Sequence, residues 1–543
     1  MKAESKFRIF LSALAVAGSL LVWMATSSYG PGLSTDGARY LSTAESIAAG
    51  RGIIDYLGLP LVNWPPLYPF LLAGLKLLTG LDVFALGQII NIVAFGAIIY
   101  LGGVFFERSM PGNWTLAYVA SLVLATSLPL LEVSANIASD PLFLICVLLF
   151  LLAAQNYLRE RNRGAWWQMA ALAVAACFLR YAGLTLIISG TLIVFFSYRL
   201  RGVRTESSPT KKSPTATWGL PRFATLARNG WRAAGFGLVS GLPIAAFAIL
   251  HNLPATGSLL GAHRPSIALT NFIFLFEKMA GWFLPLSWLS GLAALAIFAL
   301  LSALLLAASN RTRRRSWLKT LQGNEIFPSL VFTLVYGAVL IFSISTSEHQ
   351  VPGSQRIHAV LLPAFLVLAG SALQGLAPKL PRKIGGTSLR TILLAGFALW
   401  LLLPIYRVQA YVRASVQQGD VSYYNLYNTR TLRESDIVAH ISSLEISGDT
   451  KVYSNNEGAA WFYLRRRIYR LPRYDAEAGE DLAAVMATFE GWPGADEQAM
   501  LVWFERELDY KEEVPTPEQM AEFIRLTPTF TGRYGDVYRI DVE

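Results

Sequence analysis

The chain has 543 residues, of which 54% are hydrophobic and 15% are charged. Soluble domains average roughly 45–50% apolar and about 25% charged residues, so this composition excludes an ordinary soluble protein of this size. The formal net charge of +10 comes from basic loops between apolar segments, which is typical of membrane topology and not of nucleic-acid binding.

Apolar segments that lack Asp, Glu, Lys and Arg predict membrane-spanning helices. About 20 apolar residues cross the hydrocarbon core as a helix, and most of the segments are long enough. The two shorter segments on either side of Arg180 indicate a helical hairpin. The segments lie at 9–25, 83–106, 114–131, 141–158, 165–179, 183–198, 233–250, 284–308, 326–345, 357–375 and 391–406. The sequence therefore predicts a polytopic α-helical membrane protein with about 11 transmembrane helices.

The distribution of Lys and Arg predicts the orientation of the chain. If the basic N-terminus is cytoplasmic, eleven spans place most of the basic loop residues before residue 407 inside, as the positive-inside rule requires. The first segment also has features of a cleaved signal peptide, but no small-x-small cleavage site precedes Asp36, so we expect an uncleaved anchor. We expect a multi-pass protein of the cell (inner or plasma) membrane, with the N-terminus cytoplasmic and the C-terminal part extracytoplasmic.

The first outer loop, residues 26–82, carries the most informative residue of the chain. Asp36 lies just beyond the first span, in Ser34-Thr35-Asp36-Gly37. The segment 66–80 contains Lys76 and is short for a span, so we predict an interfacial or re-entrant helix. A carboxylate at a membrane surface is within reach of both lipid-borne and water-borne substrates, which suggests chemistry at Asp36.

Other ionisable residues lie where outer loops meet spans. Asp140, in Asp140-Pro141-Leu142-Phe143, lies just before the predicted span 141–158 and is partly desolvated. We therefore expect it to have a charged or hydrogen-bonding partner or a functional role. Arg356 also sits where a span begins, and its guanidinium suits phosphate binding and simple interfacial anchoring equally. Acids in such places suit general-base work or metal ligation, and cations suit phosphate binding. For Glu45 and Asp55 we expect only solvation of the first outer loop.

The last 137 residues differ in charge from the rest. Residues 407–543 carry a net charge of −8 and residues 1–406 a net charge of +18. This asymmetry predicts a membrane catalytic domain over 1–406 and a small soluble α/β domain over 407–543. In the second domain we expect strands at 451–454, 500–504 and 537–541, a helix at 459–466, and a solvated or headgroup-facing role for Arg465-Arg466-Arg467.

Three motifs carry a resemblance to a known family. They are the Asp-Gly-x-x-Tyr-Leu run from Asp36 to Gly52, Trp-Pro-Pro-Leu-Tyr-Pro from Trp64 to Pro69, and Ala-Ser-Asp-Pro-Leu-Phe from Ala138 to Phe143. Together they resemble the GT-C glycosyltransferases, in the branch of the protein O-mannosyltransferases and lipid A aminoarabinose transferases. Phe178–Leu184 and the segment from Arg356 to Pro363 are also similar to that group. Many members have Asp-Glu where this chain has Asp36-Gly37.

The resemblance implies transfer of a sugar from a polyprenyl-phosphate donor to an acceptor hydroxyl of a lipid, glycan or protein at the outer membrane face, usually with inversion. Asp36 would be the base, and Asp140 would shape or charge the same cavity. A divalent cation, if the reaction uses one, would be held by these two acids, and no other cofactor and no nucleic acid is expected. The implied phosphate ligands are Arg356, Arg180 and Arg264, and the implied substrate contacts are Tyr40, Trp64, Tyr68 and His358.

A transporter or lipid flippase with an outer binding domain is the main alternative. Coupled carriers usually have ionisable residues near the bilayer midplane and often two related halves. The predicted spans contain no Asp, Glu, Lys or Arg, and the sequence shows no internal repeat. This favours an enzyme. A sensor or assembly subunit with an outer binding domain is a third alternative, but it does not explain the positions of Asp36 and Asp140.

Overall fold

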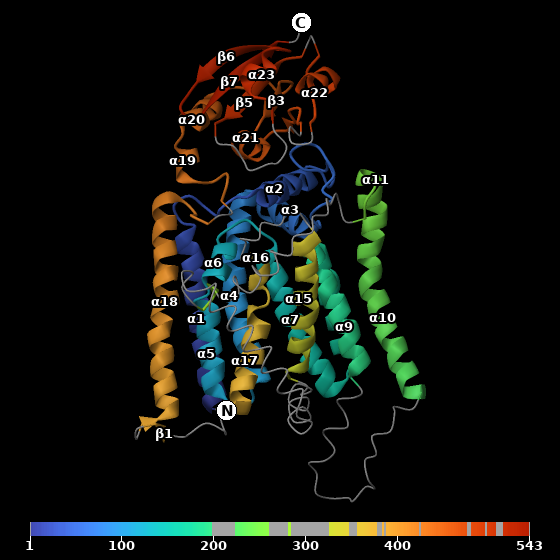
Figure 1. Ribbon diagram of the computed structural model, residues 1–543, viewed down its shortest axis with the longest axis vertical. Helices are drawn as coiled ribbons and strands as arrows, with labels where there is room; N and C mark the ends of the chain where they lie inside the picture. The colour runs from blue at the N-terminus through green and yellow to red at the C-terminus, as the bar shows by residue number, and fades with distance from the viewer. Residues whose placement is uncertain are drawn as a thin grey trace, which may run out of the picture.

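The computed structural model describes most of the chain, as a helical bundle beneath a small mixed domain (Figure 1). The N-terminus lies at the end of the bundle opposite to that domain. The described residues are 2–197, 223–259, 281–283, 325–346, 356–376, 383–384, 387–422, 425–474, 479–494, 497–505 and 514–541.

The apolar segments form the helices of the bundle. Among the described residues, five helices are long and apolar enough to cross a membrane, and α5 with α6, bent by 48°, makes a sixth candidate. The predicted span 284–308 lies outside the described residues, and each of the others coincides with a helix or helix pair. These are α1 Lys2–Ala25, α4 Val83–Ser109, α5 Trp114–Ala125, α6 Leu128–Ser134, α7 Asp140–Glu160, α8 Arg163–Leu179, α9 Leu184–Phe196, α10 Phe223–Phe247, α15 Phe327–Thr346, α16 Arg356–Ala359, α17 Leu362–Leu376 and α18 Leu389–Gln418.

Short elements connect or extend these helices. The 3-10 turn η1 (Tyr181–Gly183) follows Arg180 and separates α8 from α9, at the hairpin that the sequence predicts. A π-helical turn, η4 (Ala248–Asn252), and α11 (Leu253–Thr256) extend α10, and β1 (Lys383–Ile384) pairs with β2 (Thr387–Ser388) before α18.

Glycines bring α1 and α4 into close contact. A Cβ atom at Gly96 would collide with the Ser19 hydroxyl, and one at Gly103 would collide with Leu11. Small residues at such crossings let helix backbones approach closely in a membrane. Because these two helices flank residues 26–82, the first outer loop begins and ends at neighbouring helix ends.

The first outer loop contains two helices, α2 (Thr35–Ala48) and α3 (Leu67–Thr79). Both lie at the end of the bundle that faces the mixed domain (Figure 1). α3 has 13 residues and is therefore about 20 Å long, too short for a hydrocarbon core of about 30 Å. Its length fits the interfacial or re-entrant helix that the sequence predicts, and that placement stays a prediction.

The mixed domain, called the outer domain after its predicted orientation, is built on a five-stranded sheet in the order β4-β3-β5-β7-β6. β3 pairs in parallel with β4 and β5, and β7 is antiparallel to β5 and β6. The three predicted strands and the predicted helix are present. The sequence pattern did not predict β4, β6 and α20. The elements are α19 Arg430–Arg433, α20 Asp436–Ser443, β3 Lys451–Ser454, α21 Glu457–Leu464, β4 Ile468–Tyr469, α22 Leu482–Thr488, β5 Ala499–Phe504, α23 Pro517–Met520, β6 Arg525–Thr531 and β7 Gly535–Asp541.

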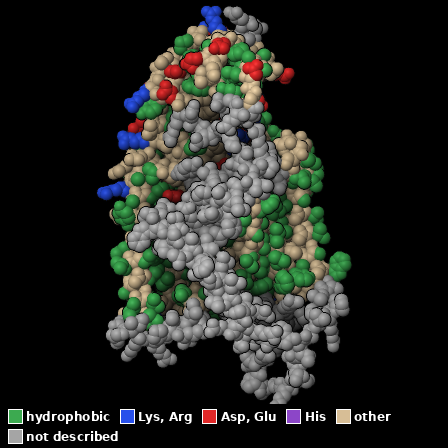
Figure 2. All heavy atoms as spheres, viewed as in Figure 1, with side chains coloured by type: hydrophobic (Ala, Val, Ile, Leu, Met, Phe, Trp, Pro, Cys, Tyr) green, Lys and Arg blue, Asp and Glu red, His purple; other side chains and the backbone are tan. Residues whose placement is uncertain are grey.

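Surface chemistry distinguishes the two parts. In Figure 2, Asp and Glu side chains gather on the outer domain, and the visible described side of the bundle is largely apolar. Helix α18 runs from the bundle to Gln418, so a single helix passes the expected boundary after residue 406. That boundary stays a prediction.

The outer domain rests on the first outer loop. The backbone N–H of Ile468 donates to the carbonyl of Tyr56 (3.0 Å). The rings of Tyr56 and Trp461 stack with centroids 6.0 Å apart, and Phe84 packs on Phe462 at 5.2 Å. The loop that carries Asp36 is therefore held between the bundle and the outer domain.

Candidate active site

Asp36 and Asp140 both lie in the first turn of a helix. The Ser34 hydroxyl accepts the N–H of Gly37 (3.2 Å), and this N-cap starts α2 at Thr35. Asp140 is the first residue of α7 and is followed by Pro141, which suits a helix start. The positive end of the helix dipole favours a carboxylate at each position.

Arg356 joins these two acids. Its Nη1 donates to Asp36 Oδ2 (2.8 Å) and its Nε donates to Asp140 Oδ2 (2.6 Å). The Nη1 of Arg180 binds the other oxygen of Asp140, Oδ1, at 2.6 Å. Asp36, Asp140, Arg180 and Arg356 thus form one four-residue charge cluster, assembled from α2, α7, α16 and the break between α8 and α9.

The two carboxylates of the charge cluster differ in exposure. The side chain of Asp36 is 28% exposed and that of Asp140 is 4% exposed. Burial works against the charged form of Arg356, but the charges of Asp140 and Asp36 outweigh it and raise the pKa of this guanidinium. Asp36 is therefore the more accessible of the two carboxylates, and the buried Asp140 forms ion pairs with both arginines.

Two of the expected substrate contacts, Tyr40 and Tyr68, lie beside the cluster. The Tyr40 hydroxyl shares a hydrogen bond of 3.1 Å with the hydroxyl of Ser139, the residue before Asp140. Burial, followed by the charge of Asp36, raises the pKa of Tyr40 to about 12, so it stays a neutral phenol. The ring of Tyr68 meets that of Tyr40 edge-on, with centroids 5.2 Å apart. Both side chains are buried and pack beside the charge cluster without reaching the surface.

His358, Arg264 and Trp64 fall elsewhere or outside the described residues. His358 is buried in α16, two residues after Arg356. Arg264 lies outside the described residues. Trp64 packs on the guanidinium of Arg39 (5.1 Å from Cζ to the ring centroid) and has no hydrogen bond or ion pair with the charge cluster. Its role as a substrate contact stays a prediction.

Asp55 differs from the solvated loop charge that the sequence suggests. It is buried, forms an ion pair with Arg39, and accepts the backbone N–H groups of Leu57 (2.9 Å) and Leu59 (3.2 Å). The cation and the two N–H groups compensate its burial. Asp55 therefore holds the turn of the first outer loop together.

Sequence reasoning missed two residues that support the cluster. Ser139 directly precedes Asp140, and the sequence suggested no role for it, but its hydroxyl shares a hydrogen bond with Tyr40. Tyr336, in α15, donates from its hydroxyl to the carbonyl of Ile357 (2.9 Å) and so fixes the helix that carries Arg356. A polar hydroxyl within an otherwise apolar predicted span was the one available signal for Tyr336.

A metal site does not form in the described part of the chain. No group of three or more His, Cys, Asp and Glu residues that could hold a metal lies together there. Asp36 and Asp140 are both bound by arginine, with Arg356 between them. This arrangement does not fit a divalent cation.

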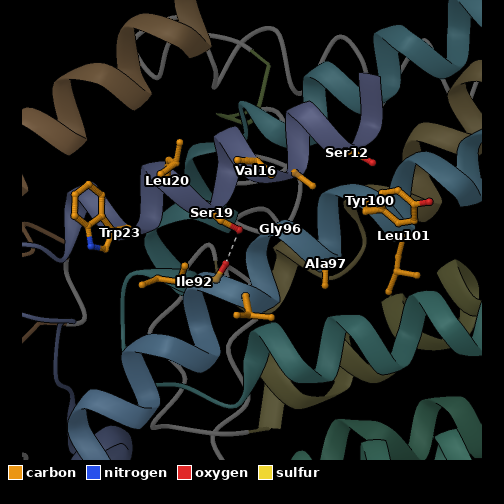
Figure 3. Close-up of a pocket in the computed structure, with 12 residues that line it drawn as sticks. Ser12, Val16, Ser19, Leu20, Trp23, Ile92, Gly96, Ala97, Tyr100 and Leu101 are labelled. Atoms are coloured by element: carbon orange, nitrogen blue, oxygen red, sulfur yellow. Dashed lines mark hydrogen bonds between the residues drawn. The ribbon is translucent and has the colours of Figure 1, made fainter. Parts of the chain in front are cut away.

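A separate groove lies between α1 and α4, with a volume of about 850 Å³ (Figure 3). None of its lining residues is charged, and Ser19 donates its hydroxyl to the carbonyl of Ile92 (2.8 Å). Such a lining provides neither an acid nor a phosphate ligand. The charge cluster is thus the better candidate for chemistry.

Two solved structures share the architecture of the whole chain. One is ArnT from Cupriavidus metallidurans in the apo state, with a TM-score of 0.57 and 16% identity over 97% of each chain. The other is the same protein bound to undecaprenyl phosphate, with a TM-score of 0.56 and 16% identity over 97% of each chain. The chain shares the fold of these structures, which belong to the GT-C glycosyltransferases. No protein-family model and no curated protein sequence matches it.

This shared fold confirms the resemblance that the three sequence motifs indicated. It also confirms the prediction of a multi-pass helical membrane protein. The likeness covers the outer domain as well as the bundle, since it extends over 97% of the chain. At 16% identity it concerns the fold alone, so the roles of individual residues have to be argued from their geometry.

Proposed function

We propose that this protein is a membrane glycosyltransferase that moves a sugar from a polyprenyl-phosphate donor to an acceptor hydroxyl. The observation that carries the proposal is the charge cluster, at the meeting point of the bundle and the first outer loop of a GT-C fold. It combines one partly exposed carboxylate, one buried carboxylate and two arginines. An ArnT structure with undecaprenyl phosphate bound supports the choice of donor class.

Asp36 takes the proton in the proposed reaction. The acceptor oxygen attacks the anomeric carbon of the sugar, the bond from that carbon to the phosphate oxygen breaks, and the acceptor proton passes to the Asp36 carboxylate. Polyprenyl phosphate leaves with the bonding electron pair. Attack from the face opposite to the phosphate gives inversion, and general-base help of this kind contributes typically ~10²–10⁴-fold.

Arg356 and Arg180 bind the donor phosphate in this scheme. The charge on the phosphate grows as it leaves, and fixed cations in a site with little water stabilise it. Arg356 Nη1 donates a hydrogen bond to Asp36 Oδ2 (2.8 Å). A phosphate oxygen that takes over this N–H group releases Asp36 to receive the acceptor proton, so donor binding prepares the base. Asp140 holds both arginines in place during the exchange.

The proposed orientation puts this site outside. On the exposed outer domain, Ser447→Cys should react with a membrane-impermeant maleimide in intact cells or spheroplasts. Asn162→Cys, exposed between α7 and α8, should react only after permeabilisation. Both variants need the Cys146→Ser and Cys177→Ser background, because these two thiols are free. The reverse labelling pattern would place the charge cluster at the cytoplasmic face.

The direct test is donor cleavage by the purified full-length protein. It is incubated with a panel of polyprenyl-phosphate sugars and candidate acceptors, and free polyprenyl phosphate is measured by mass spectrometry. We expect acceptor-dependent release with one donor, abolished in Asp36→Asn. A transporter would instead move intact donor across a vesicle membrane without release, and that result would overturn the proposal.

A further inference from the structure

A short segment that leads into the outer domain clamps the start of the first outer loop. The backbone N–H groups of Leu426 and Tyr427 both donate to the carbonyl of Leu33 (3.0 Å each), and the N–H of Leu33 donates to Asn425 Oδ1 (3.0 Å). The side-chain amide of Asn428 donates to the carbonyls of Tyr29 and Pro31, both at 2.7 Å. Residues 29–33 are thus fixed from the outer-domain side.

The same loop is fixed from the α7 side. The N–H of Gly32 donates to the carbonyl of Ala135, and the N–H of Ile137 donates to the carbonyl of Gly32 (2.9 Å each). Ile137 lies three residues before Asp140, and a Cβ atom at Gly37 would meet the Ile137 carbonyl at 2.9 Å. The approach to Asp36 and the approach to Asp140 are therefore built against each other.

Tyr427 continues this clamp to the first residue of α2. Its hydroxyl shares a hydrogen bond of 2.8 Å with the hydroxyl of Thr35, the neighbour of Asp36. The Tyr427 side chain is 1% exposed. Its ring lies so close to Gly458 of α21 that a Cβ atom there would collide with it, and the Tyr463 hydroxyl donates to its carbonyl (2.9 Å). The outer domain thus holds Tyr427 rigidly against α2.

We propose that Tyr427 is a positioning residue through which the outer domain sets the amino end of α2, so that the Asp36 carboxylate meets Arg356. This rests on the proposed function of Asp36. Catalytic groups must be held within about 0.5 Å of their productive place by packing and by hydrogen bonds from the surrounding residues. The Tyr427–Thr35 hydrogen bond acts on the residue adjacent to Asp36, where a small displacement moves the carboxylate.

The experiment removes the hydrogen bond between Tyr427 and Thr35. Tyr427→Phe and Thr35→Val each delete one hydroxyl, and Thr35→Ser keeps it. We expect kcat to fall about tenfold in each deletion variant, with KM for donor and acceptor nearly unchanged, because misplacement by a fraction of an ångström lowers reactivity. The double variant should lose no more than either single one, because both remove the same interaction. Thr35→Ser should keep nearly full activity.

Tyr453→Phe is the matched control. Tyr453 is also a fully buried tyrosine of the outer domain, and its hydroxyl donates to the carbonyl of Gly491 (2.6 Å), with no hydrogen bond to α2. It should leave kcat unchanged. A loss in Tyr453→Phe equal to that in Tyr427→Phe would mean general loosening of the outer domain and would overturn the proposal. Additive losses in the Tyr427/Thr35 double variant would do the same.

Hydrogen exchange separates this inference from the proposed function. In Tyr427→Phe, peptides that cover residues 29–40 should take up deuterium faster, and peptides from α4 should not change. Unchanged exchange together with unchanged kcat overturns the positioning role. If the parent protein releases no polyprenyl phosphate from any donor, the function of Asp36 fails, while faster exchange would still support the contact that sets α2.

Discussion

Helix α2 carries an acidic residue with charged partners near each end, and the two sets of partners differ in burial. At its start, Asp36 belongs to the charge cluster with Arg356, Asp140 and Arg180. Near its end, Glu45 lies 3.2 Å from Arg465 and 3.9 Å from Lys76, and Arg465 also lies 3.7 Å from Asp82. In this second group, the interface cluster, the Asp82 side chain is 50% exposed. At the other end, the Asp140 side chain is 4% exposed.

Exposure decides what each cluster can contribute. Exposed ion pairs typically stabilise a protein by about 0–1 kcal/mol, because water screens them. Buried charges cost several kcal/mol each in lost hydration, of the order that their mutual attraction returns, so buried ion pairs are weak devices for stability. The interface cluster therefore fits a role in aligning the outer domain on the first outer loop, whereas the charge cluster fits the proposed chemistry better than a role in stability.

The largest effect is expected for Asp36→Asn. The amide keeps the volume and accepts a hydrogen bond from Arg356, but it cannot take the acceptor proton, so kcat should fall by ~10²–10⁴-fold. Donor affinity and thermal stability should be retained. Glu45→Gln, the same chemical change in the same helix, is the matched control. Near-normal transfer by folded Asp36→Asn would rule out this base and remove the functional distinction between the two clusters.

Arg356→Ala should follow in size. It removes the cation between two carboxylates and a proposed phosphate ligand, so donor binding should weaken by about 10- to 100-fold, the range for hydrogen bonds to charged groups. Arg356→Lys should recover only part, because an ammonium lacks the planar fork. Donor affinity is measured by titration with the polyprenyl-phosphate sugar, on protein whose thermal unfolding is checked. Parental affinity in folded Arg356→Ala would leave Arg356 as a structural bridge.

Asp140→Asn should have a smaller effect on turnover. Arg356 and Arg180 would lose the charge that holds them, and we expect kcat to fall about tenfold, through misplacement of these groups. Thermal stability should fall as well, because two half-buried cations lose a partner. Turnover assays with and without a chelator test the alternative. A loss as large as that of Asp36→Asn, with chelator-sensitive parent enzyme, would identify Asp140 as a metal ligand.

The smallest effect is expected for Glu45→Gln. Burial, offset in part by Arg465 and Lys76, raises the pKa of Glu45. A carboxyl with a raised folded-state pKa stabilises the fold below its unfolded pKa and loses that contribution as pH rises through the folded one. At neutral pH, Glu45→Gln should therefore be neutral or stabilising by at most about 1 kcal/mol. The difference in melting temperature should shrink towards pH 4, and clear destabilisation at pH 7 would show that the interface cluster matters more than its exposure suggests.

The sequence determined the parts of this protein that depend on local pattern. Apolar length predicts where helices cross the membrane, and the change in net charge after residue 406 predicts a separate outer domain. Asp36 and Asp140 were identifiable because each lies at a span mouth, where a carboxylate needs a reason. Arg356 was identifiable as a cation at the same depth, with anchoring and phosphate binding left open.

Only the tertiary structure decided which of these residues meet. Asp36 and Arg356 are 320 positions apart, and Thr35 and Tyr427 are 392 apart. No local pattern carries such a pairing, because it depends on how helices pack and on which loop ends they bring together. Trp64 and Asp36 lie in the same loop, in two motifs that resemble the same family, but Trp64 packs on Arg39, which forms an ion pair with Asp55. Burial, the other deciding quantity, distinguishes Asp36 from Asp140 and the charge cluster from the interface cluster, and it exists only once the chain is packed.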